Sequence, residues 1–213
     1  MDTTELPLRA VVRDRIRRLI IDGSLAPGSR LVERSLDAEL AVSRVPVREA
    51  LRDLVAEGYA VDRPTSPDNQ RRGIAVRDYP AEEIDELFDV RAALESVLLH
   101  RSFTVLSDEG RGRLRRCLDT AAAALERDDL VAAVDANAAF HQVWADAVAG
   151  PLTRGLLSGI RDRMQWLLRQ HDDPAAIHLE HEALFTAIVD GDEPAADRIF
   201  RQHLSTSRAA VAR

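Results

Sequence analysis

Two short helical patterns separated by a tight turn constrain the fold of this 213-residue chain more than any other feature. They span residues 33–59, ERSLDAELAVSRVPVREALRDLVAEGY, and the second pattern opens with Arg44 and Arg48, which lie one helical turn apart on one face. A recognition helix reads base edges in the major groove with residues at its N-terminal end. The stretch therefore predicts a helix-turn-helix that contacts DNA.

The flanking residues complete a winged helix-turn-helix over residues 1–79. Helical spacing of apolar residues, the Asp22-Gly23 stop and the N-cap candidate Ser43 predict helices at residues 8–22, 33–40 and 44–58. Two β-prone runs follow, at residues 59–63 and 73–77, and a polar loop joins them. Three helices and a hairpin in this order are typical of that fold.

Residues 80–213 show helical periodicity throughout and form a second expected domain. Most of the periodic segments begin at Pro or just after Ser or Asp, which are helix-start signals. They predict six helices, at residues 81–103, 108–127, 130–149, 151–170, 174–190 and 194–211. Short connections between them indicate antiparallel neighbours. The expected fold class is mainly α, with the winged helix-turn-helix followed by an all-α antiparallel six-helix bundle.

The charge of the chain is divided unevenly between these two regions. Residues 1–79 carry 14 Arg against 13 Asp and Glu, whereas residues 80–213 carry 15 Arg against 23. Basic side chains neutralise DNA phosphates only where they contact them. A first domain with almost no net charge can therefore bind DNA if its arginines lie together on one face. No apolar run is long enough to cross a bilayer and the N-terminus does not resemble a signal peptide, so we expect a cytoplasmic protein without membrane contact.

Eight residues of the first domain are the candidates for DNA contact. They are Arg34, Ser43, Arg44, Val45, Arg48, Arg71, Arg72 and Gly73. Arginine binds guanine or phosphate through a planar fork of donors, and a glycine at the wing tip permits a close approach to the DNA backbone. The alternative is that these arginines are solvated and form surface ion pairs with Glu33, Glu49 or Asp53.

The second domain contains a possible ligand set for a metal ion. In NAAFH, Asn137 and His141 lie one turn apart, while His181 and His203 fall in the apolar patterns HEALFTAI and RIFRQHL of the last two helices. Three imidazoles and one oxygen donor inside a bundle suit Zn, Ni or Mn. The alternative from spacing alone is ordinary surface or hydrogen-bonded histidines.

The motifs of the first domain resemble those of GntR-type bacterial transcription regulators. SLAPGSRL at 24–31, ER at 33–34, VSRVPVREAL at 42–51 and EGY at 57–59 carry the resemblance. It implies that Arg34, Arg44, Arg48 and the wing glycine, Gly73, contact operator DNA. Val45 departs from the small or hydroxylated residue usual after Arg44, and the wing loop is longer than usual.

Residues 80–213 resemble the FCD effector domain of the FadR subfamily, in its six-helix, VanR-like form. The resemblance implies a metal bound by Asn137, His141, His181 and His203, which helps to hold a carboxylate effector. Asn137 replaces the usual aspartate and gives up a charge. Arg91 in LFDVRAALE, and Arg163, are the expected effector-binding residues; the alternative for Arg91 is a surface ion pair with Glu95.

The expected function is a homodimeric transcription regulator, a repressor, which binds double-stranded operator DNA and responds to a small organic acid. Dimerisation follows from one recognition helix per half-site. Two alternatives remain: a regulator that senses the metal itself, and a metal-dependent hydrolase that uses the histidines to activate water. Against the hydrolase, no residue is obviously placed as a general base, and the DNA-binding domain would have no role. We therefore expect the protein not to be an enzyme.

Overall fold

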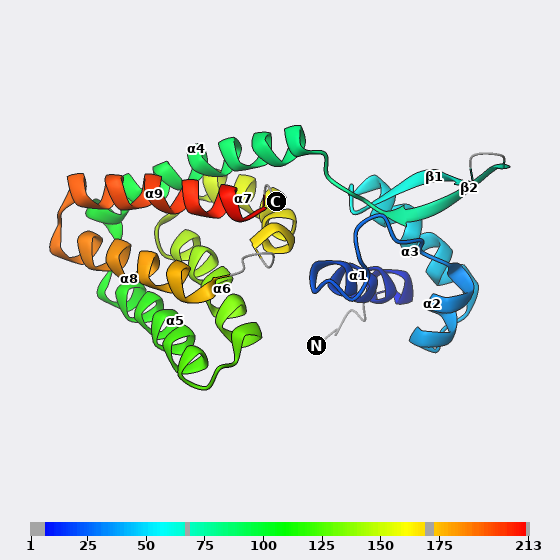
Figure 1. Cartoon of the computed structure of the whole chain (residues 1–213), viewed down its shortest axis with the longest axis horizontal. Coiled ribbons are helices and arrows are strands. Elements are labelled where there is room, and N and C mark those ends of the chain that lie inside the picture. The colour runs from blue at the N-terminus through cyan, green and yellow to red at the C-terminus, as the bar shows by residue number, and fades with distance from the viewer. Residues whose placement is uncertain (1–6, 67–68, 169–172, 212–213) are drawn as a thin grey trace, which may run out of the picture. The chain divides into compact units, whose positions relative to one another are not determined.

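A computed structural model describes residues 7–66, 69–168 and 173–211, except for the side chains of residues 64–66, 69–72, 162, 165–168 and 211. The chain divides into two compact units, Met1–Tyr79 and Pro80–Arg213. The first contains three helices and a β-hairpin, and the second contains helices alone in its described part (Figure 1). The predicted fold class is confirmed.

Three helices build the core of the first unit: α1 (Leu8–Ile21), α2 (Glu33–Leu40) and α3 (Arg44–Ala56). On α1, Val12, Ile16 and Ile20 recur every four residues, so they form one apolar face, and all three are buried. This face packs against α3, whose Leu51 and Leu54 have no exposed surface. The packing holds α3 in place while its opposite face stays in solvent.

The turn between α2 and α3 is tight because Ala41 adopts a left-handed conformation, with φ of 53°. Its backbone N–H and that of Val42 both donate to the carbonyl oxygen of Asp37, which closes the end of α2. Ser43 occupies the N-cap position of α3, as predicted, but its side chain makes no capping hydrogen bond. Its hydroxyl group remains exposed to solvent at the start of the helix.

The wing is an antiparallel hairpin of β1 (Ala60–Ser66) and β2 (Asn69–Val76). Both strands extend into the segment that the sequence predicted as a polar loop, because backbone pairing along a solvated hairpin does not require apolar alternation. The other edge of β2 pairs with the chain before α2: the Leu31 N–H donates to Ile74 O at 2.8 Å, and the Val76 N–H to Ser29 O at 2.9 Å. These bonds attach the wing to the helical core.

Six helices make up the described part of the second unit. They are α4 (Ala81–Val105), α5 (Asp108–Glu126), α6 (Leu130–Val148), α7 (Pro151–Leu168), α8 (Pro174–Asp190) and α9 (Glu193–Val211). Ser107, Asp129 and Asp173 begin α5, α6 and α8 by accepting a backbone N–H from the first turn. These caps explain why the predicted helix starts agree closely with the observed ones.

The core of the bundle surrounds Trp144, which has no exposed surface. Its indole N–H donates to the Ser102 hydroxyl at 2.7 Å, so its polar atom is satisfied inside the core. Helix α9 lies between α4 and α8 and contacts both (Figure 1). No helix in the described ranges is both long and apolar enough to span a membrane.

Candidate metal centre and nucleic-acid interface

The predicted DNA-reading residues of α2 and α3 are accessible to a ligand. Exposed side chains belong to Arg34, Ser43, Arg44, Val45 and Arg48. Val45 is 65% exposed although it is apolar, so its side chain serves no packing role in this chain. The N-terminal turn of α3 therefore presents a solvated surface of two arginines around an exposed valine.

Arg44 and Arg48 of α3 each form an ion pair with an acidic residue of α2. Arg44 Nε lies 3.2 Å from Asp37 Oδ2, and Arg48 contacts both carboxylate oxygens of Glu33, with Nη2 3.0 Å from Oε2. The hydrogen bond to Glu33 raises the pKa of Arg48. The pair with Glu33 is one that the surface alternative named, whereas the pair with Asp37 is not; both are solvated and therefore weak. A DNA phosphate or guanine can take the place of the carboxylates.

A groove of about 450 Å³ lies beside Arg48 and is lined by residues of α2, α3 and the wing, including Gly73. Arg30 and Arg52 also line this groove, and the sequence reasoning missed both. Arg52 was detectable, because it continues the spacing of Arg44 and Arg48 along the same face of the helix. The structure thus brings Arg48 and Gly73 together and adds two basic residues to them.

The wing arginines, Arg71 and Arg72, have side chains outside the described part of the structure. Their backbone belongs to β2, where Arg72 pairs with Pro64 of β1. Their contact with DNA stays a prediction.

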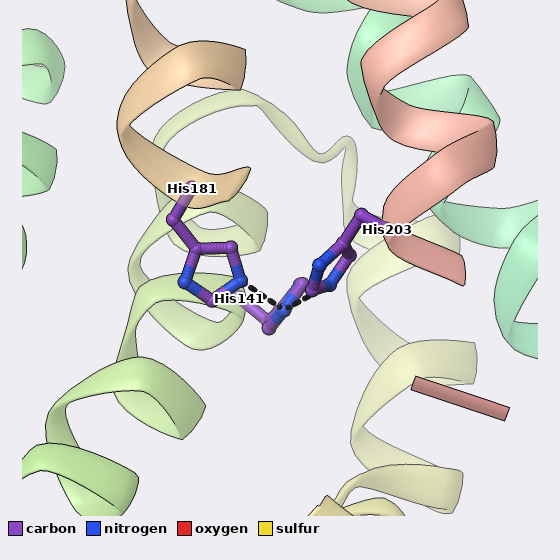
Figure 2. Close-up of side chains that lie close together, drawn as sticks. All are labelled: His141, His181 and His203. Carbon is purple, nitrogen blue, oxygen red and sulfur yellow. Dashed lines mark hydrogen bonds between the residues drawn. The ribbon is translucent and has the colours of Figure 1, made fainter. Parts of the chain in front are cut away.

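Three histidines from three helices converge inside the bundle (Figure 2). His141 of α6 lies between the other two: its Nε2 is 3.0 Å from Nε2 of His181 on α8 and 3.3 Å from Nε2 of His203 on α9. His181 and His203 are each only 1% exposed. The structure therefore brings together three of the four predicted metal ligands at one buried point.

Burial determines the charge of these imidazoles. It is the largest effect on each: it lowers the pKa of His203 to about 4, and it lowers the pKa values of His181 and His141 below the ordinary value. All three rings are therefore neutral at pH 7, and each offers a lone pair. Adjacent lone pairs repel one another unless a proton or a cation lies between them.

The fourth predicted ligand, Asn137, lies beside this cluster. Its Nδ2 donates to the carbonyl oxygen of Pro174 at 2.9 Å, which fixes the orientation of the amide. Its Oδ1 is buried and has no hydrogen-bond partner among the described residues. Asn137 and the three histidines line a common cavity of about 10 Å³, roughly the space of one water molecule.

The donor set fits a divalent transition metal. Nitrogens bound to one ion at about 2.0–2.1 Å lie about 3.0–3.4 Å apart in octahedral or tetrahedral geometry. The separations of 3.0 and 3.3 Å between the imidazole Nε2 atoms fall in that range. Neutral imidazoles and an unpartnered amide oxygen suit Zn, Ni or Mn.

Arg91 lies inside the bundle, next to the histidines, and so its alternative as a surface residue is wrong. It is 2% exposed, and its Nε lies 3.1 Å from Glu95 Oε1. Its Nη2 lies 2.9 Å from His141 Nε2 and 3.4 Å from His203 Nε2. Burial alone would raise the pKa of Glu95, but Arg91 and His141 outweigh that effect and hold this pKa well below its usual range.

A second cavity, of about 50 Å³, lies on the other side of His141, between α4, α6 and α7. Its polar lining consists of Arg91, Glu95, His141, Gln142 and Arg161. The charged residue of α7 among the lining residues is Arg161, which the sequence did not indicate, and the predicted Arg163 is not among them. Two residues correspond to about 200° of rotation around a helix, so both side chains cannot face the same cavity.

Comparisons with known proteins match both units of the chain. Residues 8–67 match the family described as bacterial regulatory proteins, gntR family, and residues 86–206 match the FCD domain. The HTH-type transcriptional repressor RspR of Escherichia coli K12 is 26% identical, over 96% of this chain and 89% of RspR. An HTH-type transcriptional regulator from an unstable DNA locus of Streptomyces ambofaciens is 31% identical, over 89% of this chain and 79% of the relative.

Solved structures show the same arrangement of elements. The crystal structure of a transcriptional regulator from Rhodococcus sp. RHA1 aligns with a TM-score of 0.77, covering 95% of this chain and 96% of the other, at 24% identity. The two relatives from Escherichia coli and Streptomyces ambofaciens are named as transcription regulators, which confirms the prediction that the chain is not an enzyme.

Proposed function

The chain belongs to the GntR family of bacterial transcription regulators and carries an FCD domain, and from this premise we propose that it is a repressor controlled by a small carboxylate. The carboxylate would bind in the C-terminal bundle, next to a divalent metal held by Asn137, His141, His181 and His203. Since operator DNA lies in the bacterial cytoplasm, the proposal places the protein there.

The exposed arginines of α3 support operator binding by this chain. Arg44 and Arg48 share one face at the start of the helix, where base edges are read, and Arg30 and Arg52 add positive charge beside them. Ser43, Val45, Arg34 and the wing complete the proposed interface. A homodimer would place one such helix in each half of a palindromic site.

One observation carries the effector proposal: the two arginines that line the 50 Å³ cavity beside the histidines each have a guanidinium nitrogen without a partner among the described residues. Arg91 Nη1 and Arg161 Nε are both buried and lack a hydrogen-bond partner among the described residues. Unpaired buried donors are costly, and a carboxylate satisfies them better than any neutral group. A metal at the histidines would add a positive charge for the same ligand. The cavity holds only a few water-sized groups, so we propose a short-chain acid.

Thermal-shift measurements on the full-length protein test this proposal. Zn²⁺, Ni²⁺ and Mn²⁺ are added singly, then short mono- and dicarboxylates, and DNA binding is followed by mobility shift on a fragment that the wild-type protein selects from a random pool. We expect a metal and an acid together to raise the melting temperature and to change DNA binding. Arg161→Gln should lose the acid response, and Arg163→Gln, its matched control on the same helix, should keep it. Equal responses in both variants would contradict the assignment of the cavity.

The small size of that cavity favours a second candidate, a regulator that senses the metal itself. The three histidines and Asn137 supply four donors without help from a small molecule. If metal is the signal, a chelator will change DNA binding in the complete absence of organic acids. If it is not, chelation alone will leave operator affinity unchanged and an acid will be required.

A further inference from the structure

Two carboxylates lie directly behind two of the clustered imidazoles. His141 Nδ1 is 3.1 Å from Glu95 Oε1, and His203 Nδ1 is 2.9 Å from Glu180 Oε2. In both rings the opposite nitrogen, Nε2, faces the centre of the cluster. Each carboxylate therefore contacts an imidazole on the side away from the proposed metal.

This geometry fixes which ring nitrogen carries the proton. An ionised carboxylate only accepts hydrogen bonds, so the neutral imidazole opposite it must carry its proton on Nδ1. Nε2 then keeps its lone pair, which is what a metal ion requires. A carboxylate in this position also makes the imidazole a stronger ligand.

The two carboxylates are themselves held in place. Arg91 Nε donates to the same oxygen of Glu95 that faces His141, at 3.1 Å. On the other side of the cluster, the Thr206 hydroxyl donates to Glu180 Oε1 at 2.7 Å. Both acids are thus oriented before any ligand binds, Glu95 by an arginine of its own helix and Glu180 by a threonine of α9.

We propose that Glu95 and Glu180 are positioning residues of this centre. They hold His141 and His203 with the Nε2 lone pairs turned inward, and they supply close by the negative charge that the neutral Asn137 does not. The proposal rests on the metal centre of the proposed function. It explains how the chain can bind a metal without a charged ligand at position 137.

Glu180 gives the better test, because its side chain is 19% exposed, whereas Glu95 is buried and paired with Arg91. Glu180→Gln keeps the size of the side chain, but its amide can donate as well as accept. Glu182→Gln is the matched control: Glu182 also lies on α8, but it contacts Arg115 of α5 instead of the cluster.

The first measurement needs no metal. Long-range ¹H–¹⁵N spectra of the chelator-treated full-length protein report which imidazole nitrogen is protonated. We expect Nδ1–H for His141 and His203 in the wild type and in Glu182→Gln, and a mixed tautomer for His203 alone in Glu180→Gln. A wild-type His203 protonated on Nε2, or a Glu180→Gln spectrum identical to the wild type, would overturn the positioning role.

The second measurement is Zn²⁺ affinity, by competition with a chelating dye. Loss of such an outer carboxylate lowers metal affinity about 10- to 100-fold, which is our expectation for Glu180→Gln, with Glu182→Gln unchanged. Asn137→Asp should restore most of the lost affinity in the Glu180→Gln background, and its failure to do so would overturn the charge argument. If the wild type shows the expected tautomers but binds none of Zn²⁺, Ni²⁺ and Mn²⁺, the metal of the proposed function is wrong and the positioning role stands.

Discussion

The guanidinium group of Arg91 lies 2.9 Å from Nε2 of His141, so a cation of the chain itself contacts the lone pair that a metal would use. The same nitrogen is 3.4 Å from His203 Nε2. Without metal, Arg91 therefore offsets the repulsion among the imidazole lone pairs. With a metal bound, the ion and the Arg91 guanidinium would compete for the same imidazole lone pairs, so we expect Arg91 to move away from His141. This movement would couple metal binding to capture of a carboxylate.

Arg91→Met should destabilise the metal-free bundle strongly. The change leaves Glu95 buried without its ion-pair partner, and breaking a buried pair in this way costs about 3–5 kcal/mol. Denaturant unfolding, monitored by tryptophan fluorescence, measures this loss of stability. The signal reports on the bundle because both tryptophans, Trp144 and Trp166, belong to the second domain. Arg208→Met, at an exposed ion pair with Asp89, serves as the control and should have little effect. A loss below about 1 kcal/mol for Arg91→Met would show that the buried pair does not stabilise the bundle.

Arg44→Ala and Arg48→Ala should each weaken specific DNA binding while the protein remains folded. Removing one base-reading arginine is expected to reduce affinity about 10- to 100-fold and to relax specificity at the contacted position. Mobility shift on the selected fragment gives the affinity, and gel filtration reports the oligomeric state. Arg201→Ala, which removes an exposed arginine of α9, controls for the lost charge. Unchanged binding by both recognition-helix variants would rule out the proposed role of α3.

Local signals in the sequence account for most of the fold. Helix α8 spans Pro174–Asp190, as predicted, because Asp173 caps its start and Gly191, with φ of 74°, ends it. Such signals act over a few residues and do not depend on the tertiary fold. The polar wing strands were predicted too short, since their pairing depends on the backbone and not on an apolar pattern.

The candidate site was less predictable, because it depends on how each helix is rotated against its neighbours. Arg91 and Glu95 show the i, i+4 spacing of an ordinary surface pair, and only the packing of α4 shows that they are buried. For the same reason the sequence did not indicate Arg161, which lines the cavity beside His141. Glu180 precedes the proposed ligand His181 in sequence, yet it contacts His203 on another helix, and no periodicity indicates such a contact.

Ala41→Gly should stabilise the helix-turn-helix. Ala41 has a positive φ of 53°, a conformation that costs an ordinary residue about 1 kcal/mol and glycine much less. Part of that gain is lost to the greater freedom of glycine in the unfolded chain, so we expect about 0.5 kcal/mol of net stabilisation. Ala38→Gly, at an exposed interior position of α2, is the matched control and should destabilise the domain. Circular dichroism during thermal unfolding distinguishes the two, and destabilisation by Ala41→Gly would contradict the strain at this turn.

The metal-free bundle should lose stability as the pH falls from about 6.5 to about 4. Burial lowers the pKa of His203 to about 4 in the folded protein, whereas an unfolded histidine titrates near its ordinary value of 6.5. Between these values the unfolded chain binds a proton that the folded chain excludes, so the free energy of unfolding decreases as the solution becomes more acidic. The shift corresponds to about 3 kcal/mol for this histidine at the acid end of the range. His141 and His181, whose pKa values are also lowered, act in the same direction.

Urea unfolding of the chelator-treated protein at several pH values, followed by tryptophan fluorescence, measures this dependence. His203→Gln should flatten the curve, because its side chain does not titrate. Saturating metal should strengthen the dependence on pH, since protons then compete with the ion for the same nitrogens. A free energy of unfolding that stays constant from pH 7 to pH 5 without metal would show that the cluster does not exclude protons in the folded state.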